Sequence, residues 1–222
     1  MRLSKETVEV LKNFSTINQN IMVKEGNKLR TISTMKNILA EADVSEVFPS
    51  EFGIYDLNEF LGAMSLADGA ELNFDNDKYL LVNGGSTEIK YMYSDPSILT
   101  TPPETFNPPA CDVTVDVSQS VLDKVLKASA VMQLPDVVFT NGTITATDLK
   151  NSTSNNFTEK LEGVVRDLSP HGLDDPFEAH FKAENLKMVR GDYKVDISTT
   201  AKISNWKGDV ASYWIAMEAK VD

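Results

Sequence analysis

A proline-rich segment divides this chain of 222 residues almost in the middle. Residues 94–110, SDPSILTTPPETFNPPA, hold five of the nine prolines. Proline lacks a backbone donor, and Pro-Pro pairs favour extended polyproline geometry, so this segment is a connector and not part of a sheet. We therefore expect a domain over residues 1–93, a connector over 94–110 and a second domain over 111–222, each long enough to bury a core.

The two halves show the same order of helices and strands. Apolar residues at helical spacing predict helices over 4–18, just after Asp56, over 118–132 and over 183–188. Runs typical of strands lie at 21–23, 29–33, 38–43, 70–74, 79–82, 87–93, 112–117, 137–140, 144–148, 158–166, 177–181, 193–199, 201–203 and 212–219. The predicted class is α+β, and an internal duplication rests on element order, because the halves do not visibly align.

The first predicted helix carries lysines opposite its apolar side. At 100° per residue, apolar positions such as Leu11 and Phe14 spread over one broad arc, while Lys5 and Lys12 nearly eclipse each other on the other side. Ser4 is a suitable N-cap. The alternative is an ordinary amphipathic surface helix with solvated lysines.

Two later segments repeat this chemistry. Lys124 and Lys127 share the side of the helix over 118–132 that faces away from its apolar residues. Lys187 and Arg190 follow within the next short helical segment, which we expect to end at Gly191 as a C-cap. Cations near a helix C-terminus also suit the helix dipole, which is a simpler explanation for Arg190.

The overall charge argues against unspecific binding of polyanions. The chain has 21 basic and 33 acidic residues, a formal net charge of −12 and a pI near 4.6. Such a protein repels DNA at long range, so DNA binding requires cations gathered on one surface.

Several classes of protein are not indicated by the sequence. Apolar runs are too short for a membrane span, and there is no signal-peptide pattern, so we expect a cytoplasmic protein. One cysteine, Cys111, and two histidines supply too few ligands for a zinc site. Nucleotide-binding and metalloprotease motifs are missing, and NGGST over 83–87 reads as a hairpin turn. We expect no enzyme activity, no cofactor and no metal.

Four stretches carry a resemblance to a known family. They are LSKETVEVLKNFSTINQNIM (3–22), IYDLNEFLGAMSL (54–66), NLKMVRGDYKV (185–195) and SYWIAMEAK (212–220). Together they resemble the sliding clamp, the DNA polymerase processivity factor, of T-even-type tailed bacteriophages.

The resemblance implies two similar processivity-fold domains with antiparallel sheets outside, and helices that line a ring of three subunits. Such a ring encircles duplex DNA without sequence preference, tethers the replicative DNA polymerase, and is opened by a clamp loader ATPase. By resemblance, Lys5, Lys12, Lys127 and Lys187 face the DNA. Lys124 and Arg190 join them by helical geometry only. The expected location is the cytoplasm of the infected bacterial host.

Partner proteins of this family insert an apolar C-terminal peptide into a pocket beneath the connector. The resemblance makes Ile98, Leu99, Tyr213 and Ile215 candidates for that pocket. Tyr213 and Ile215 also fit as alternating core residues of a strand, and Trp214, which points the other way, is an equal candidate. A different class remains open, an acidic β-rich phage structural protein of the tail or baseplate, in which the lysines meet solvent or a neighbour.

Overall fold

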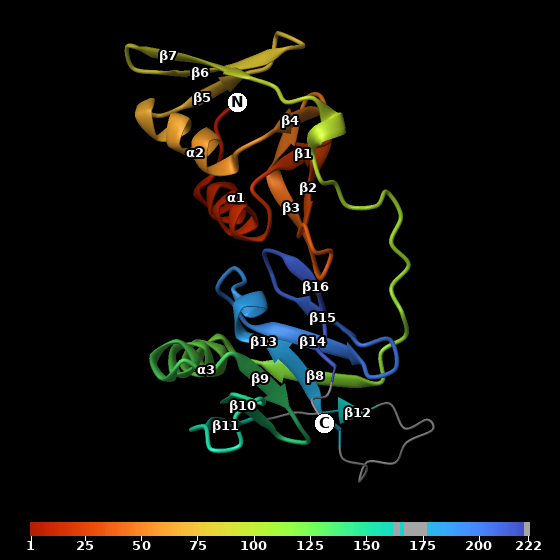
Figure 1. Cartoon of the computed structure of the whole chain (residues 1–222). Helices are drawn as coiled ribbons and strands as arrows, with labels where there is room; N and C mark the ends of the chain where they lie inside the picture. The colour runs from red at the N-terminus through yellow and green to blue at the C-terminus, as the bar shows by residue number, and fades with distance from the viewer. Residues whose placement is uncertain (162–164, 167–176, 220–222) are drawn as a thin grey trace. The chain divides into compact units, whose positions relative to one another are not determined.

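The computed structural model describes residues 1–161, 165–166 and 177–219. The chain forms two compact units, residues 1–104 and 105–222 (Figure 1). The division falls inside the proline-rich segment, where the chain forms a short 3-10 helix, η1 (Pro96–Ile98). Domain limits at 93 and 111 remain a prediction.

The first unit places two helices side by side against antiparallel strands. Its elements are α1 (Lys5–Ile17), β1 (Ile21–Val23), β2 (Gly26–Ile32), β3 (Ile38–Phe48), β4 (Phe52–Ile54), α2 (Leu57–Leu66), β5 (Glu71–Asn73), β6 (Tyr79–Gly84) and β7 (Thr87–Met92). β1 pairs with β4, β2 pairs with β3, and β5, β6 and β7 form a meander. α1 packs against both α2 and β3.

The second unit follows the same plan with one more strand at its start. Its elements are β8 (Val113–Val117), α3 (Gln119–Met132), β9 (Asp136–Phe139), β10 (Thr143–Thr147), β11 (Phe157–Lys160), β12 (Val165–Arg166), β13 (Ala179–Lys182), the 3-10 helix η2 (Ala183–Leu186), β14 (Tyr193–Ser198), β15 (Ile203–Lys207) and β16 (Ser212–Ala216). β11, β10, β9 and β13 form one sheet in that order, and β12, β8, β14, β15 and β16 pair in that order. α3 packs against β10, β11 and η2.

Strand pairing repeats between the units although their sequences do not align. The pair β9–β13 corresponds to β1–β4, β10–β11 corresponds to β2–β3, and the meander β14–β15–β16 corresponds to β5–β6–β7. Even β8 has a counterpart, because Met1 and Leu72 exchange two backbone hydrogen bonds of 2.8 and 2.7 Å beside β5. The pairings within the described parts of both units are antiparallel, and the predicted α+β class is confirmed.

Local capping explains where the helices begin. The Ser4 hydroxyl accepts a hydrogen bond from the Thr7 N–H at 3.1 Å, and Ser118 accepts one from the N–H of Val121 at 3.4 Å. The Asp56 carboxylate accepts from the N–H groups of two residues in the first turn of α2. Each side chain satisfies donors that a helix N-terminus leaves without partners, which confirms the predicted starts of α1, α2 and α3.

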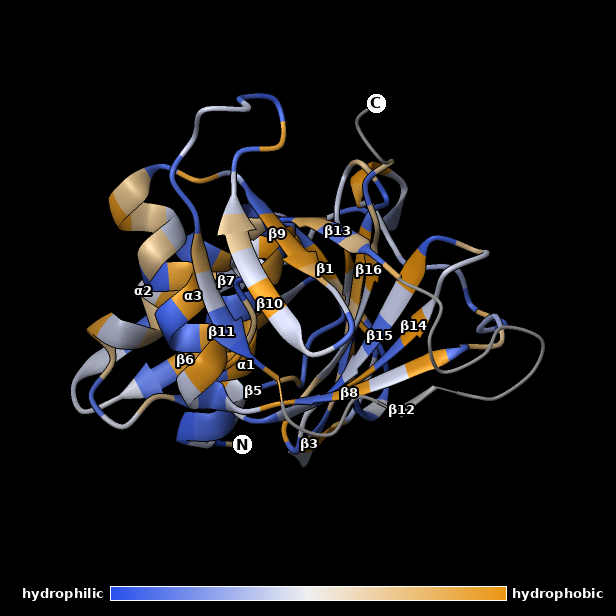
Figure 2. Cartoon of the chain, turned by 90° about the horizontal axis from the view of Figure 1, so that it is seen from below, coloured by the Kyte–Doolittle hydropathy of each residue, from blue (hydrophilic) through white to orange (hydrophobic). Residues whose placement is uncertain are grey.

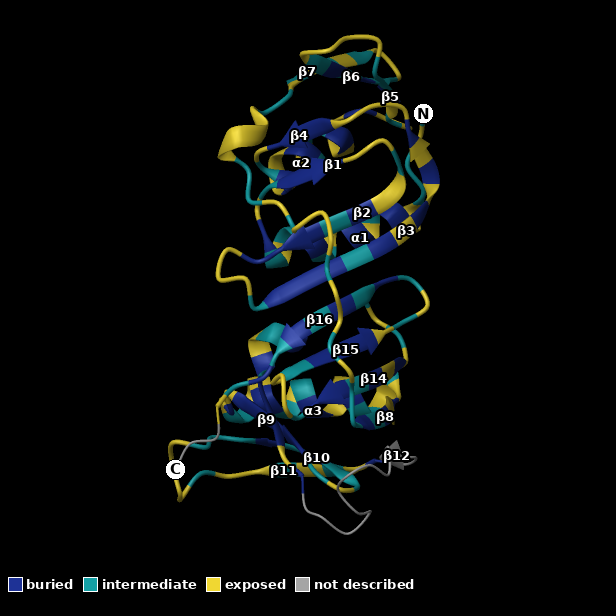
Figure 3. Cartoon of the chain, turned by 90° about the vertical axis from the view of Figure 1, so that its right-hand side faces the viewer, coloured by how far each residue is buried: buried dark blue, intermediate teal, exposed yellow. Residues whose placement is uncertain are grey.

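Each unit has its own apolar core (Figures 2 and 3). In the first unit, Val10, Leu11 and Phe14 of α1 are buried against the strands. In the second unit, the fully buried Trp206 of β15 lies among the rings of Phe139, Phe181 and Tyr193, with centroids 5.6 to 6.1 Å away. Such tilted and edge-to-face rings bury large apolar areas, which holds the two sheets of this unit together.

Three predicted elements differ from the structure. The strand expected over 201–203 begins at Ile203, because Lys202 takes a left-handed conformation (φ 56°) that ends a turn. The helix expected over 183–188 is a single 3-10 turn, η2, whose C-cap is Lys187, so Gly191 is not its C-cap. The strand expected over 158–166 corresponds to β11 and β12, with residues 162–164 outside the described residues.

Candidate nucleic-acid interface

The lysines of α1 lie on its solvent side. Lys5 and Lys12 are exposed, and they lie opposite the buried Val10, Leu11 and Phe14. Within the described ranges neither lysine forms an ion pair. The predicted exposure of both side chains is confirmed, and their ammonium groups are available to an external anion.

A carboxylate on the same face was missed by the sequence reasoning. Glu9 is exposed on α1, four residues after Lys5 and three before Lys12, so helical geometry places it beside both. The spacing of Glu9 from the two lysines in the sequence was enough to predict this position. The face is therefore mixed in charge, with two cations and one anion.

A buried carboxylate fixes the start of α1. Glu46 of β3 is only 9% exposed, and it accepts hydrogen bonds from the Ser4 N–H and the Thr7 hydroxyl. Burial raises the pKa of this carboxyl, but the hydrogen bonds from Thr7 and Ser4 outweigh it and leave the pKa below its ordinary value. The charged group thus ties the helix start, and with it the direction of Lys5, to the sheet.

On α3, the two lysines differ in their surroundings. Lys127 is exposed near the middle of the solvent side and has no ion pair among the residues described. Lys124 lies near the flank, and its Nζ forms an ion pair with Glu159 of β11 at 3.3 Å. The two lysines that were predicted to share the solvent side of this helix therefore differ in their charge environment.

Arg190 bridges a loop to the first turn of α3. The Nη2 atom of Arg190 lies 2.5 Å from the Asp123 carboxylate. When the Gln119 amide is oriented with its oxygen toward Arg190, that oxygen accepts hydrogen bonds from Arg190 Nη2 and Nε, both at 3.0 Å. Asp192 accepts from the Gln119 N–H at 2.7 Å. These contacts hold the loop after η2 against the helix.

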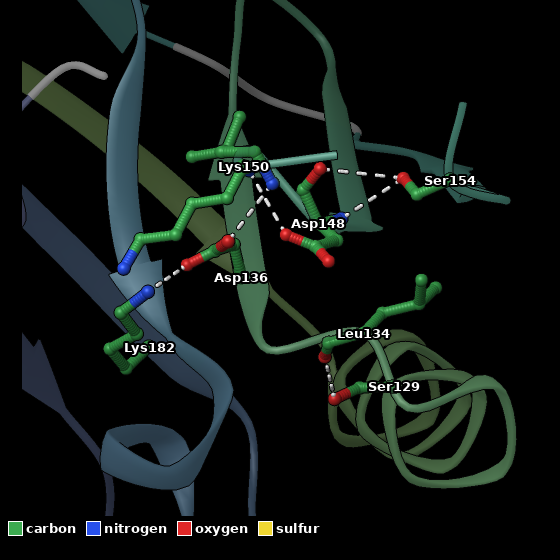
Figure 4. A network of polar contacts seen from close by, with 8 residues as sticks. Ser129, Leu134, Asp136, Asp148, Lys150, Ser154 and Lys182 are labelled. Atoms are coloured by element: carbon green, nitrogen blue, oxygen red, sulfur yellow. Dashed lines mark hydrogen bonds and ion pairs between the residues drawn. The ribbon is translucent and has the colours of Figure 1, made fainter. Parts of the chain in front are cut away.

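Lys187 is exposed at the end of η2, beside a cavity of about 550 Å³ in the second unit. The cavity is also lined by Lys182, whose ammonium is already bound to Asp136 (Figure 4). The Asp136 carboxylate is 2% exposed and also accepts from the Leu149 N–H at 3.0 Å. The bond to Asp136 raises the pKa of Lys182, so this lysine serves the fold.

The four residues predicted for a peptide pocket fall into two groups. Tyr213 and Ile215 are both 0% exposed, and the Tyr213 hydroxyl accepts from the Val189 N–H at 3.1 Å. Both side chains are buried in β16, as the alternative of core residues expected, and a part in a peptide pocket stays a prediction. Ile98 is 59% exposed and Leu99 is half-buried against Gly53, so both remain candidates.

Other kinds of site have little support in the described residues. No group of three or more metal-ligating side chains occurs in the part of the chain that the structure covers. Over the same residues, no helix is long and apolar enough to cross a bilayer. Burial raises the pKa of the Cys111 thiol, which favours the unreactive protonated form.

Comparison with known families covers nearly the whole chain. Residues 4–99 match the DNA polymerase processivity factor family, and residues 114–219 match the C-terminal part of the gp45 sliding clamp. The sliding clamp of Vibrio phage KVP40 is 37% identical over 229 residues, covering 99% of this chain and 100% of that protein. The sliding clamp of Enterobacteria phage T4 is 29% identical over 224 residues, covering 99% and 97%.

Solved structures show the same fold at low sequence identity. The PCNA of A. fulgidus, solved with the C-terminal region of FEN-1 bound, has a TM-score of 0.72 at 15% identity, covering 99% of this chain and 98% of that chain. The PCNA of Thermococcus kodakaraensis has a TM-score of 0.70 at 16% identity, covering 96% of each. The similarities favour a clamp over a structural protein of the phage particle. The chain belongs to the sliding clamp family of DNA polymerase processivity factors.

Proposed function

We propose that this protein encircles duplex DNA as a closed ring of three subunits and tethers the replicative DNA polymerase for processive synthesis. The observation that carries the proposal is the exposure of cations on α1, on α3 and after η2, in a chain with a net charge of −12. A clamp loader ATPase opens the ring, and the site of action is the cytoplasm of the infected host. The full-length similarity to phage sliding clamps supports each of these points.

Lysine side chains suit a ring that must slide. They attract phosphate, release counterions and carry no sequence information, so the bound duplex can move with little preference for position. Lys5, Lys12, Lys127 and Lys187 are the residues we assign to this contact. Acidic residues elsewhere repel DNA from the remaining surface.

Ring closure requires strand edges that accept a neighbouring subunit, and β7 and β11 suit this role. Each lies at the edge of its sheet in the described part of the chain. α2 packs against β7 and α3 packs against β11, and each helix exposes one large apolar side chain, Leu66 (73%) and Val131 (74%). Pairing of β7 with β11 of the next subunit would be heterologous and would let the two apolar residues meet.

Two other edges are less suitable because chain segments already cover them. The Arg30 guanidinium beside β2 donates to the Pro103 carbonyl of the connector at 3.0 Å. The His180 carbonyl of β13 accepts from the Glu218 N–H at 2.8 Å. These contacts favour β7 and β11 as the subunit interface.

The polymerase contact is proposed at the connector. Ile98 and Leu99 form an apolar pair at the end of η1, and Leu99 touches Gly53 of β4. The Asn20 side chain accepts from the Thr100 N–H at 3.0 Å, which holds the next residue against the first unit. An apolar peptide from a partner could pack against this held segment.

A charge-reversal variant tests the proposal. Replacing Lys5, Lys12, Lys127 and Lys187 with Glu should abolish processive synthesis in the presence of the loader and ATP, because phosphate would then be repelled from the lining of the ring. Sedimentation should still give a trimer, since none of these residues lies on β7 or β11.

A matched control changes four exposed lysines outside the helices, namely Lys78, Lys150, Lys194 and Lys202. Converting them to Glu alters the net charge by the same amount and should leave processivity within about twofold, because screening limits their effect at a distance. Equal loss in both variants, or none in the first, would contradict the assignment.

A further inference from the structure

Two cations that helical geometry predicted to face the DNA, Lys124 and Arg190, already have anionic partners. Lys124 Nζ lies 3.3 Å from Glu159, and Arg190 Nη2 lies 2.5 Å from Asp123. Glu159 belongs to β11 and Asp123 to α3, so the carboxylates come from different elements. They therefore do not belong to a single acidic cluster.

Both ion pairs border the exposed lysine of α3. At 100° per residue, Asp123 and Lys124 lie about 40° and 60° to either side of Lys127. One pair thus flanks Lys127 toward β11, and the other flanks it toward the loop that follows η2. Any polyanion that contacts Lys127 meets both pairs.

Both ion pairs are accessible to solvent, and this accessibility determines how strong they are. All four side chains are partly exposed, Lys124 and Arg190 by more than half. Exposed ion pairs are weak, because water screens them and two long side chains lose entropy. A phosphate can therefore compete with the carboxylate, and the cation is shared instead of being permanently occupied.

We propose that Asp123 and Glu159 limit the attraction of the protein for DNA by sharing Arg190 and Lys124 with the phosphate backbone. This proposal rests on the proposed function and concerns the strength of the same contact. A ring that is held on DNA by topology has no need of tight binding, and each extra bond to phosphate retards sliding. The carboxylates keep the local positive charge low enough for the ring to move.

The test removes the two charges and keeps the side-chain shape. An Asp123→Asn, Glu159→Gln variant, whose trimer is first checked by sedimentation because Glu159 lies on β11, is compared with the wild type for binding to a short linear duplex over a range of salt concentrations. We expect about fivefold tighter binding at low salt, and a log–log salt slope steeper by about one for each additional phosphate that the protein neutralises. Single-molecule tracking of rings loaded on long DNA should show slower diffusion by a similar factor.

The matched control removes two charges from ion pairs on the strands and turns of the first unit. Asp43 pairs with Lys28 at 2.9 Å, and Glu51 pairs with Lys24 at 2.5 Å. An Asp43→Asn, Glu51→Gln variant has the same net charge as the test variant and should keep the wild-type slope and diffusion. Equal effects in the two variants would show that net charge alone acts, and would overturn the proposal.

A third variant, Lys127→Glu, separates this proposal from the assigned DNA face. If Lys127→Glu weakens binding while the Asn/Gln variant keeps the wild-type slope, the proposal is wrong and the DNA face stands. If neither variant changes binding, the DNA face itself is wrong. Should Asp123→Asn disturb folding through Arg190, Glu159→Gln alone leaves that contact in place, and it should give about half of the slope change.

Discussion

The two units share one pattern of strand pairing, but they differ in how charge is arranged on their helices. α1 and α3 occupy the same place in the plan and both carry two lysines. The second helical elements diverge, because α2 has ten residues and no basic side chain, whereas η2 is a four-residue turn followed by Lys187 and Arg190. In the second unit, carboxylates engage Lys124 and Arg190.

The shared strand pairing and the different helix charges indicate which features the fold requires. Pairing and burial recur in both units without visible sequence similarity, because many apolar residues can fill a core of given shape. The charged residues on the surface can differ between the units as long as the proposed contact with DNA is kept. The second unit has cations at its second helical position and also the carboxylates that moderate them.

The largest expected effect concerns the cores. Trp206 in β15 and Leu80 in β6 are 0% exposed in corresponding middle strands of the two meanders. Trp206→Ala should lower the free energy of unfolding of the second unit by about 4 kcal/mol, and Leu80→Ala that of the first unit by about 3 kcal/mol. Urea unfolding followed by circular dichroism measures both. Trp214→Ala, a half-buried control, should cost less than half as much as Trp206→Ala; an equal cost would contradict the assigned core.

A smaller effect is expected at the helix starts. Glu46→Gln should cost about 2 kcal/mol of unfolding free energy at pH 7, because a buried charge-assisted contact is lost. Asp192→Asn, at the more exposed start of α3, should cost less than about 1 kcal/mol.

The loss of unfolding free energy in Glu46→Gln depends on pH, and the pKa of Glu46 sets this dependence. Hydrogen bonds leave this pKa below 4.5 in the folded state, so the carboxylate stabilises the fold above pH 4.5. That stability is lost as the pH falls through the folded pKa. The difference between wild type and Glu46→Gln should therefore shrink below pH 4.5, and a difference that grows on acidification would refute this role.

The smallest effect is expected at the connector, which contacts the first unit through Leu99 and Thr100. Ile98→Ala combined with Leu99→Ala should weaken binding of the polymerase C-terminal peptide about fivefold, measured by calorimetry, because two apolar contacts are lost. Lys150→Ala on an exposed turn serves as the control. Unchanged peptide affinity in the double variant would show that the peptide does not bind at Ile98 and Leu99.

The sequence predicted features that depend on neighbouring residues. The helix caps Ser4 and Asp56 are confirmed, because each bonds to an N–H two or three residues away, and the helix expected over 118–132 begins where Ser118 caps it. The ion pairs of Lys124 and Arg190 join residues 35 and 67 positions apart, so they could not be read from spacing. Tyr213 and Ile215 fitted both a pocket and a core in the sequence, and the structure adds that both side chains are fully buried in β16.

The most direct test of the central claim is photo-crosslinking of rings that the loader and ATP have placed on circular DNA. A photoreactive residue at position 127 on α3 is compared with one at position 194, which is exposed on β14. The account predicts strong crosslinking to DNA from position 127 and background levels from position 194. Crosslinking from position 194 with none from position 127 would contradict the claim that the helix lysines face the enclosed duplex.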